Sequence, residues 1–461
     1  MSWEQQGYGG GYGHPQQPQQ PYGHEGHGQP QPYGQPQSPY PYQQQPYPQQ
    51  QQPYPQQPPY PQQYAATDYG QGAGAAVAGE TATLPAVEPE TEPETGPEPV
   101  AEQAVEEAAE KPAPKPAGRD RYFDTLRAVA LIRVVTYHTF GWAWCGMVFP
   151  SMGIMFGLAG TLMAKSLERP AFKVVKSRMR RLLPPFWFWG FFVLVAMMIH
   201  DWMPGWQIVF WIVPVGDPPG NAWGMQAWEI LWYLRTYLWF VMLSPVLLWI
   251  FRKAPIPVLL LTLVPIVILK FVWAGPDNRF GNALWDLSTY LFCWILGFAH
   301  RDGVLQKLKP FLVVTLSVAA IVFGGWYAFT HQAEAGGTYD LDESPLAQTY
   351  WSAGYVMLLM WAKAYFNIDF TWLTRFKRLD RVVTIFNSRA VTIYLWHEIA
   401  LVLAVPLTDQ FWKVPAFEKW LPLGSQWFMF GIGWILIALF IVLCGWVEDV
   451  AAKKKPRLLP S

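Results

Sequence analysis

Residues 426–447 read QWFMFGIGWILIALFIVLCGWV and contain no charged side chain. An α-helix needs about 20 apolar residues to cross the hydrocarbon core of a bilayer, because it rises only about 1.5 Å per residue. This stretch is therefore predicted to span a membrane. The composition of the chain agrees, since 51% of its 461 residues are hydrophobic and only 14% are charged. Such a composition is not typical of a soluble protein.

Nine further apolar runs of suitable length precede this one. The predicted fold class is therefore all-α, a polytopic membrane bundle of about ten transmembrane helices. The predicted spans are residues 123–146, 149–166, 183–201, 227–251, 256–274, 283–299, 311–330, 346–366, 388–406 and 426–447. A shorter apolar run at 206–215 is expected to lie at the membrane interface or to re-enter the membrane without crossing it.

The N-terminal part of the chain has a different composition. Residues 1 to about 66 consist mainly of Gln, Pro, Tyr and Gly, and residues 80–110 are acidic. Neither segment can bury a core, so residues 1–118 are predicted to form a disordered tail. A solvated extension is the simplest interpretation of this tail, and tail-mediated contacts with partner proteins are the alternative. Residues 119–447 then form the membrane domain and 448–461 a basic C-terminal tail.

The distribution of Lys and Arg predicts the orientation. If the chain has ten spans, 23 basic residues fall on the side of both termini and only three fall on the other side. Cytoplasmic loops carry an excess of Lys and Arg, so both termini are expected in the cytoplasm and the protein in the plasma membrane. No cleavable signal peptide is expected near Met1. The three cysteines show neither a zinc-binding spacing nor a disulfide framework, and no metal is expected.

Several titratable residues interrupt the predicted spans, where they should face the bundle interior or a wet cavity. Arg127 and His138 share one face of the first span and are separated by about 16 Å along its axis. This placement suits an anionic cosubstrate that enters from the cytoplasm and reaches a proton-accepting histidine. Alternatively, Arg127 binds lipid headgroups and His138 a neighbouring helix. The titratable residues are Arg127, Arg133, His138, Glu229, Arg235, Lys270, Lys363, His397 and Glu398.

Two further groups of residues stand out. Arg178 and Arg181 are three residues apart on one face of a helical turn, and paired guanidinium groups bind phosphates. A basic loop before a span binds anionic lipid equally well. Pro184 or Pro185 is expected to open the next span. His397 lies nine residues into its predicted helix, at the expected depth of His138, and taken alone it is more simply a structural residue.

Five motifs occur in a fixed order along the predicted membrane domain. They are FDTLRAVA continuing to VVTYH at 123–138, FGLAGTL at 156–162, RMRR and two prolines at 178–185, LWYL at 231–234 with Pro245, and YLWH at 394–397. Together they resemble the acyltransferase-3 family of bacterial membrane acyltransferases over about residues 119–447. Ala159 stands where that family usually has a serine, and no Gly-Asp-Ser esterase block follows the membrane domain.

The resemblance implies an O-acyltransferase of the cell envelope. Such an enzyme moves an acyl group, acetyl in the usual case, from cytoplasmic acyl-CoA to a hydroxyl of a glycan, lipid or secreted small molecule. Arg178 and Arg181 are then expected to hold CoA phosphates, and Arg127 to anchor the same cosubstrate. His138 is expected to act as the general base or to carry the acyl group itself. Membrane lipid is an expected partner and nucleic acid is not.

Four residues have weaker assignments. Glu229 and Tyr233 are candidates for contacting the acceptor, although packing is slightly favoured for both. Tyr394 and His397 are expected to support the site. The alternative function is a multispan transporter or flippase of an anionic or glycolipid substrate, which the absence of a clear internal repeat argues against. A third interpretation is an inactive scaffold that acts through its N-terminal tail.

Overall fold

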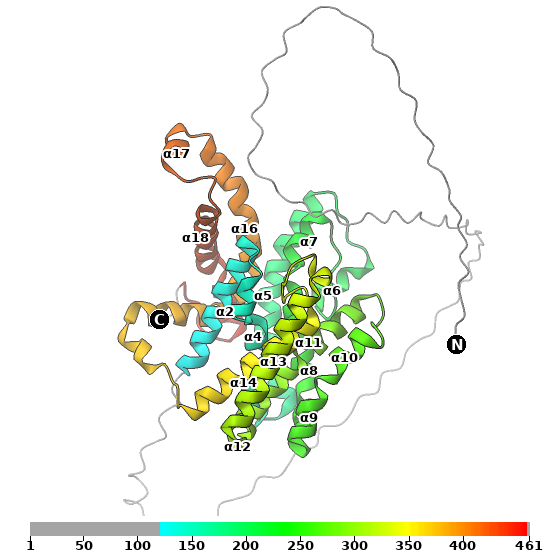
Figure 1. The fold of residues 1–461 in the computed structure, drawn as a ribbon. Helices are drawn as coiled ribbons and strands as arrows, with labels where there is room; N and C mark the ends of the chain where they lie inside the picture. The colour runs from blue at the N-terminus through cyan, green and yellow to red at the C-terminus, as the bar shows by residue number, and fades with distance from the viewer. Residues whose placement is uncertain (1–119, 459–461) are drawn as a thin grey trace, which may run out of the picture. The chain divides into compact units, whose positions relative to one another are not determined.

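The structure of the protein, a computed structural model, describes residues 120–458. The predicted N-terminal tail, residues 1–118, lies outside the described residues, as do 459–461. Within the described range the regular secondary structure is entirely helical and includes no strand (Figure 1). This confirms the predicted all-α fold class.

Long helices form the body of the bundle, and short ones fill the connections between them. The long helices are α2 (Arg121–Phe140), α4 (Ser151–Ser166), α5 (Ala171–Ile199), α8 (Leu231–Lys253), α11 (Arg279–Arg301), α13 (Pro310–Thr330), α14 (Pro345–Tyr365), α16 (Ala390–Trp412) and α18 (Gln426–Cys444). The short ones are α3 (Trp144–Val148), η1 (Trp206–Ile208), α6 (Val209–Ile212), α7 (Ala222–Trp228), α9 (Pro255–Leu261), α10 (Val264–Phe271), α12 (Val304–Lys307), η2 (Gln332–Ala335), η3 (Thr371–Arg375), α15 (Lys377–Ser388), α17 (Pro415–Trp420) and α19 (Trp446–Ala451).

Six of the helical stretches are long and apolar enough to cross a membrane. They are Trp144–Ser166, Ala171–Ile199, Leu231–Lys253, Pro310–Thr330, Ala390–Trp412 and Gln426–Cys444. The remaining predicted spans are either interrupted, as between α9 and α10, or contain charged residues, as α2 does with Arg127 and Arg133. The protein is thus a multi-pass membrane protein, and the number of ten spans stays a prediction.

Three predicted helix boundaries are wrong. Helix α2 ends at Phe140, before the expected 146, because Gly141 adopts a left-handed φ of 63° and its N–H donates to the carbonyl of Tyr137. Helix α8 begins at Leu231 because a turn separates it from α7. Pro184 and Pro185 do not open a helix, since α5 runs through both. Membrane helices tolerate proline where neighbouring structure satisfies the freed backbone groups.

Glycine residues bring α4 and α11 into close contact at the centre of the bundle. A Cβ atom on Gly160 would lie 2.2 Å from the carbonyl oxygen of Trp294, and one on Gly297 would lie 2.3 Å from that of Gly157. Only glycine therefore permits this separation of the two helices. Phe156, in the same stretch of α4, is fully buried. The FGLAGTL motif thus serves helix packing.

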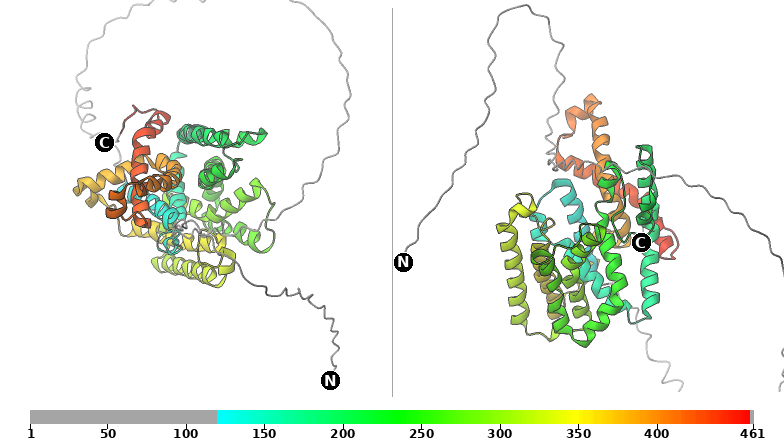
Figure 2. Two further views of the ribbon diagram at one scale, coloured as in Figure 1. Left: turned by 90° about the horizontal axis from the view of Figure 1, so that it is seen from above. Right: turned by 90° about the vertical axis from the view of Figure 1, so that its right-hand side faces the viewer.

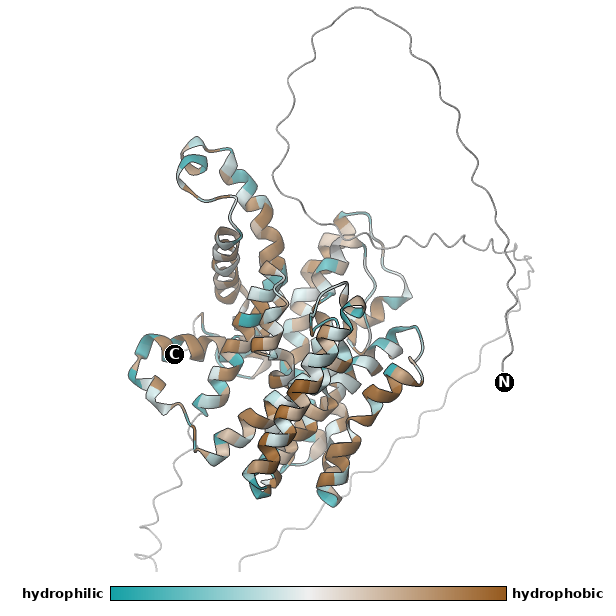
Figure 3. Ribbon diagram, viewed as in Figure 1, coloured by the Kyte–Doolittle hydropathy of each residue, from teal (hydrophilic) through white to brown (hydrophobic). Residues whose placement is uncertain are grey.

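Helix pairs lie on either side of this centre. Helices α13 and α14 pack along one edge of the bundle, and α16 and α18 form a hairpin with α17 at its tip (Figures 1 and 2). The α9–α10 segment and α13 are mostly hydrophobic (Figure 3). Exposed apolar side chains on these elements, which suit contact with lipid, include Leu260, Leu261, Val318 and Val322.

Ion pairs between helices and connecting segments mark two ends of the bundle. At the end where α2 begins, the pairs are Lys363–Asp120, Arg252–Asp302 and Arg301–Glu168. Toward the opposite end, the pairs are Lys270–Glu334 and Arg133–Asp342. These pairs agree with helices that run in alternating directions along the chain, when the α9–α10 segment is counted as one helix between α8 and α11.

Candidate functional site

Two cavities meet inside the bundle. The first, here called the arginine cavity, has a volume of about 370 Å³ and is lined by Arg127, Arg178 and Arg181 among others. The second, here called the acidic cavity, has a volume of about 270 Å³ and is lined by carboxylates described below. The residues that line both cavities are Val134, Met152, Tyr233, Tyr394 and His397. These five side chains form a shared wall between them.

Three predicted arginines come together in the arginine cavity. Arg127 lies on α2, whereas Arg178 and Arg181 lie one turn apart on α5. Arg178 Nη2 donates to Ser166 Oγ at 2.9 Å, which ties α5 to the last turn of α4. Ala159, in place of the serine usual in the motif, lines the same cavity. The cavity therefore gathers positive charge from two helices, in an arrangement suited to an anionic ligand.

The C-terminal segment also lines the arginine cavity, through Glu448, Asp449 and Lys454. Arg389, which is completely buried, donates to Asp449 Oδ2 at 2.7 Å and to the carbonyl oxygen of Arg457 at 2.6 Å. These bonds hold the segment against the start of α16. Sequence reasoning missed this role and assigned residues 448–461 to a tail. The acidic pair directly after an apolar span was the available signal.

Glu448 is bound to the first turn of α16. Its Oε1 accepts hydrogen bonds from the backbone N–H and from the hydroxyl of Thr392, both at 2.6 Å. Burial raises the pKa of Glu448 to about 7, although the bonds from Thr392 and the charge of Arg389 lower it in part. This carboxyl group thus titrates near neutral pH at the border of the arginine cavity.

Two histidines and a glutamate meet where the cavities adjoin. The rings of His138 and His397 are 5.2 Å apart and nearly perpendicular, which confirms the prediction that they lie at equal depth. His138 Nδ1 lies 3.2 Å from Glu398 Oε2, and the His138 side chain is 30% exposed. His138 lines the acidic cavity, where its ring is accessible to a ligand. Sequence reasoning noted Glu398 only as a charge within a span, because nothing in the pattern pairs it with a residue 260 positions away.

His397 has one satisfied and one free ring nitrogen. Its Nδ1 lies 2.7 Å from the carbonyl oxygen of Tyr394, which can only accept a hydrogen bond, so Nδ1 carries a proton. Its Nε2 is buried and has no hydrogen-bond partner within residues 120–458. Because His397 also belongs to the shared wall, it is placed to meet a ligand from either cavity.

The same three residues offer a set of potential metal ligands. One donor atom from each of His138, His397 and Glu398 lies within 4.8 Å of the others. Such a set has the composition of a zinc site. His138 Nδ1 and Glu398 Oε2 lie 3.2 Å apart, so the three residues can also act without a metal, as a histidine–carboxylate pair beside a second histidine.

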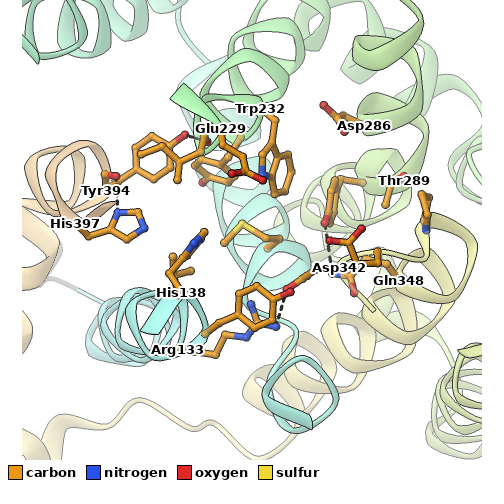
Figure 4. A pocket seen from close by; sticks show the side chains of 18 residues that line it. Arg133, His138, Glu229, Trp232, Asp286, Thr289, Asp342, Gln348, Tyr394 and His397 are labelled. Carbon is orange, nitrogen blue, oxygen red and sulfur yellow. Dashed lines mark hydrogen bonds and ion pairs between the residues drawn. The ribbon is translucent and has the colours of Figure 1, made fainter. Parts of the chain in front are cut away.

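Tyr394 positions the predicted acceptor-side residues. Its hydroxyl donates to the carbonyl oxygen of Ile230 and accepts from the backbone N–H of Leu234 at 3.3 Å. These bonds fix the turn that carries Glu229, and Tyr233 follows in the first turn of α8. Glu229 and Tyr233 both line the acidic cavity, and Glu229 lies opposite His138 (Figure 4). All eight predicted site residues thus line one cavity or both.

Comparison with protein families gives a match to the acyltransferase-3 family, described as an acyltransferase domain, over residues 120–447. Comparisons with curated proteins and with solved structures gave no match. The matched range includes the helices that carry the two histidines, the three cavity arginines and the shared wall.

Proposed function

This chain belongs to the acyltransferase-3 family of membrane proteins, and from that premise we propose that it transfers an acyl group from cytoplasmic acyl-CoA to a hydroxyl of an acceptor. The observation that carries the proposal is the junction of the two cavities. A cavity lined by three arginines adjoins the His138–Glu398 pair across a shared wall. Acyl-CoA carries its phosphates at one end of a long pantetheine arm and its thioester at the other, so the arginines suit the phosphates and the histidines suit the thioester.

The orientation follows from the charge of the connecting segments. The arginine cavity lies toward the end of the bundle where α2 begins and where most basic loop residues gather. Since cytoplasmic loops are enriched in Lys and Arg, this end faces the cytoplasm. Arg178 and Arg181 then bind the CoA phosphates, Arg127 anchors the same cosubstrate deeper in the bundle, and the acceptor enters through the acidic cavity. Acetyl is the acyl group expected from the family.

His138 acts as the general base in this mechanism. Its Nδ1 lies 3.2 Å from Glu398 Oε2, so we assign the ring proton to Nδ1 and the uptake of the proton of the acceptor hydroxyl to Nε2. The hydroxyl oxygen attacks the thioester carbonyl carbon, the carbon–sulfur bond breaks, and the CoA sulfur leaves with the proton that His138 returns. Glu398 orients the ring and stabilises the imidazolium ion while it exists. Direct transfer in this way needs no acyl-enzyme intermediate, although His138 is also placed to carry the acyl group.

Two measurements on purified protein test this proposal. We expect the wild type to bind acetyl-CoA and to hydrolyse its thioester slowly without an acceptor. His138→Ala should bind acetyl-CoA normally and lose hydrolysis, whereas Arg178→Ala combined with Arg181→Ala should lose binding. The matched control is Arg169→Ala combined with Lys173→Ala, which removes two exposed basic residues that do not line either cavity.

Well-folded wild-type protein that does not bind acetyl-CoA would contradict the proposal. Equal loss of binding in the control pair would mean that the positive charge of the loop, and not the cavity, holds the ligand. Rapid denaturation at neutral pH with a labelled acyl donor distinguishes the two chemical routes, because an acyl group carried by His138 would then still be attached to the protein.

A further inference from the structure

The proposed binding of acyl-CoA makes no use of the carboxylates in the acidic cavity. Four carboxylates line it, namely Glu229, Asp286, Asp342 and Glu343. Two buried arginines neutralise part of this charge: Arg133 pairs with Asp342 at 2.9 Å, and Arg235 pairs with Asp286 and with Asp217 behind it. Glu229 and Glu343 form no ion pair within the described residues. The cavity therefore has an excess of negative charge.

The surroundings of Glu343 show the same excess. This residue lies in the segment before α14, outside the predicted spans. Burial raises its pKa above the ordinary value, and the nearby carboxylates of Asp340, Asp342 and Glu229 raise it further. Each of these groups therefore disfavours a further negative charge beside it. An anionic ligand entering the cavity would meet the same repulsion.

Gln348 supplies an independent sign of a ligand. It lies on α14, is only 2% exposed and lines the acidic cavity. Its Nε2 donates to the hydroxyl of Tyr290 at 3.4 Å, and its Oε1 has no partner within residues 120–458. If the oxygen and nitrogen of the side-chain amide were exchanged, the amide nitrogen would be the atom without a partner. A buried polar atom without a partner costs free energy, so a ligand group that completes the bonding of Gln348 would be favoured.

A hydroxyl group is the ligand group that fits best. It both donates and accepts, so it satisfies Gln348 in either orientation of the amide. It also donates to carboxylates without adding negative charge. Trp232, stacked on Tyr290 with their ring centroids 5.6 Å apart, adds an aromatic surface to the same cavity. A ring that carries several hydroxyl groups and has an apolar face matches these walls.

The acidic cavity also leads to the proposed base. Gln348 and Asp342 lie on one side of it, and His138 and His397 lie on the other (Figure 4). A ring bound at Gln348 can therefore place one hydroxyl toward His138 and the others toward the carboxylates. We infer that the acidic cavity selects an uncharged, polyhydroxylated part of the acceptor through Gln348, and that Glu229 and Glu343 exclude acceptors with a carboxylate or phosphate there. This inference rests on the proposed acyl transfer for its biological role.

Binding of three related sugars to the purified protein tests the inference. The probes are methyl glucoside, glucosamine and glucuronate, which share one ring and differ in charge. Saturation-transfer NMR on protein in lipid nanodiscs measures their binding without acyl-CoA. We expect glucoside and glucosamine to bind at least about tenfold more tightly than glucuronate. Equal binding of glucuronate and glucoside, or no binding of any of the three, would overturn the inference.

Two variants and a control identify the residues responsible. Glu229→Gln combined with Glu343→Gln should bring glucuronate binding to within about threefold of glucoside binding. Gln348→Leu should weaken glucoside binding at least about fivefold. Glu418→Gln removes an exposed carboxylate on α17, outside the cavity, and should change nothing. If Gln348→Leu does not fold, the double variant alone tests the inference. The inference would be overturned if the double variant still prefers glucoside over glucuronate as strongly as the wild type does.

The outcome is separable from the test of the proposed function. The sugar-binding assay contains no acyl-CoA, and the thioester hydrolysis assay contains no sugar. Failure of sugar discrimination with intact acetyl-CoA hydrolysis would refute only the assignment of the acidic cavity. Loss of acetyl-CoA binding with intact sugar discrimination would refute only the transferase.

Discussion

The two cavities share one wall and differ in the sign of their charge. Arginines of α2 and α5 line one cavity, whereas carboxylates from three different segments line the other. The wall between them is mostly apolar or aromatic apart from His397. A single anionic ligand would therefore prefer one cavity and avoid the other. In the proposed reaction, this difference in charge assigns the anionic cosubstrate to one cavity and the acceptor to the other, and the two meet at the histidines.

The largest effect is expected from a change in the His138–Glu398 pair, which lies where the two cavities adjoin. Glu398→Gln keeps the size of the side chain and removes the charge that stabilises protonated His138. We expect kcat for acyl transfer or thioester hydrolysis to fall about 100-fold, while acetyl-CoA affinity is retained. Stopped-assay detection of free CoA thiol measures the rate, and a binding titration measures the affinity. Activity at the wild-type level would show that His138 works without Glu398.

A metal ion at the junction would change the meaning of that result. If His138, His397 and Glu398 act as a dyad and a neighbouring histidine, incubation with a strong chelator should leave hydrolysis unchanged within about twofold. If they hold a structural or catalytic ion, activity should disappear and return when zinc is added. Elemental analysis of the purified protein provides the second measurement.

A smaller effect is expected from the C-terminal segment beside the arginine cavity. The raised pKa of Glu448, about 7, means that the fold favours its neutral form. The stabilisation is complete below the ordinary carboxyl pKa and is lost as the pH rises through about 7. Thermal unfolding temperature in detergent should therefore decrease from pH 6 to pH 8, and it should decrease less in Glu448→Gln. Asp369→Asn, at an exposed carboxylate outside both cavities, is the control. Identical pH dependence in Glu448→Gln would contradict this assignment.

The smallest effect is expected at Ala159 in the arginine cavity. A serine there can bond the carbonyl of its own helix one turn back, so its hydroxyl need not reach a ligand. We expect Ala159→Ser to alter the KM for acetyl-CoA by less than about twofold. A larger decrease in KM would indicate that the serine usual in the family contacts the cosubstrate, and that this chain lacks one donor.

Helical periodicity accounts for what the sequence could predict of the site. Residues three or eleven positions apart share a helix face, so the grouping of Arg178 with Arg181 followed from spacing alone. The common depth of His138 and His397 followed from their distance to the helix ends. The contact between His138 and Glu398 did not, because it joins two helices that are distant in the chain.

Other features depended on packing that periodicity does not encode. The lining of the arginine cavity by Glu448 depends on how α19 turns back beside α5, and the exposure of Gln348 to a cavity depends on the position of α14. The two prolines of α5 misled the prediction for a related reason. Proline predicts a helix start when only the local backbone is considered, but tertiary contacts can maintain a helix through it.

The most direct test of the divided site is a cryo-electron microscopy structure with a non-hydrolysable acetyl-CoA analogue. We expect the phosphates to lie among Arg127, Arg178 and Arg181, and the thioester position to lie beside His138 and His397. We also expect the acidic cavity to remain open. CoA phosphates bound in the acidic cavity, or an acyl end that points away from both histidines, would contradict the divided site.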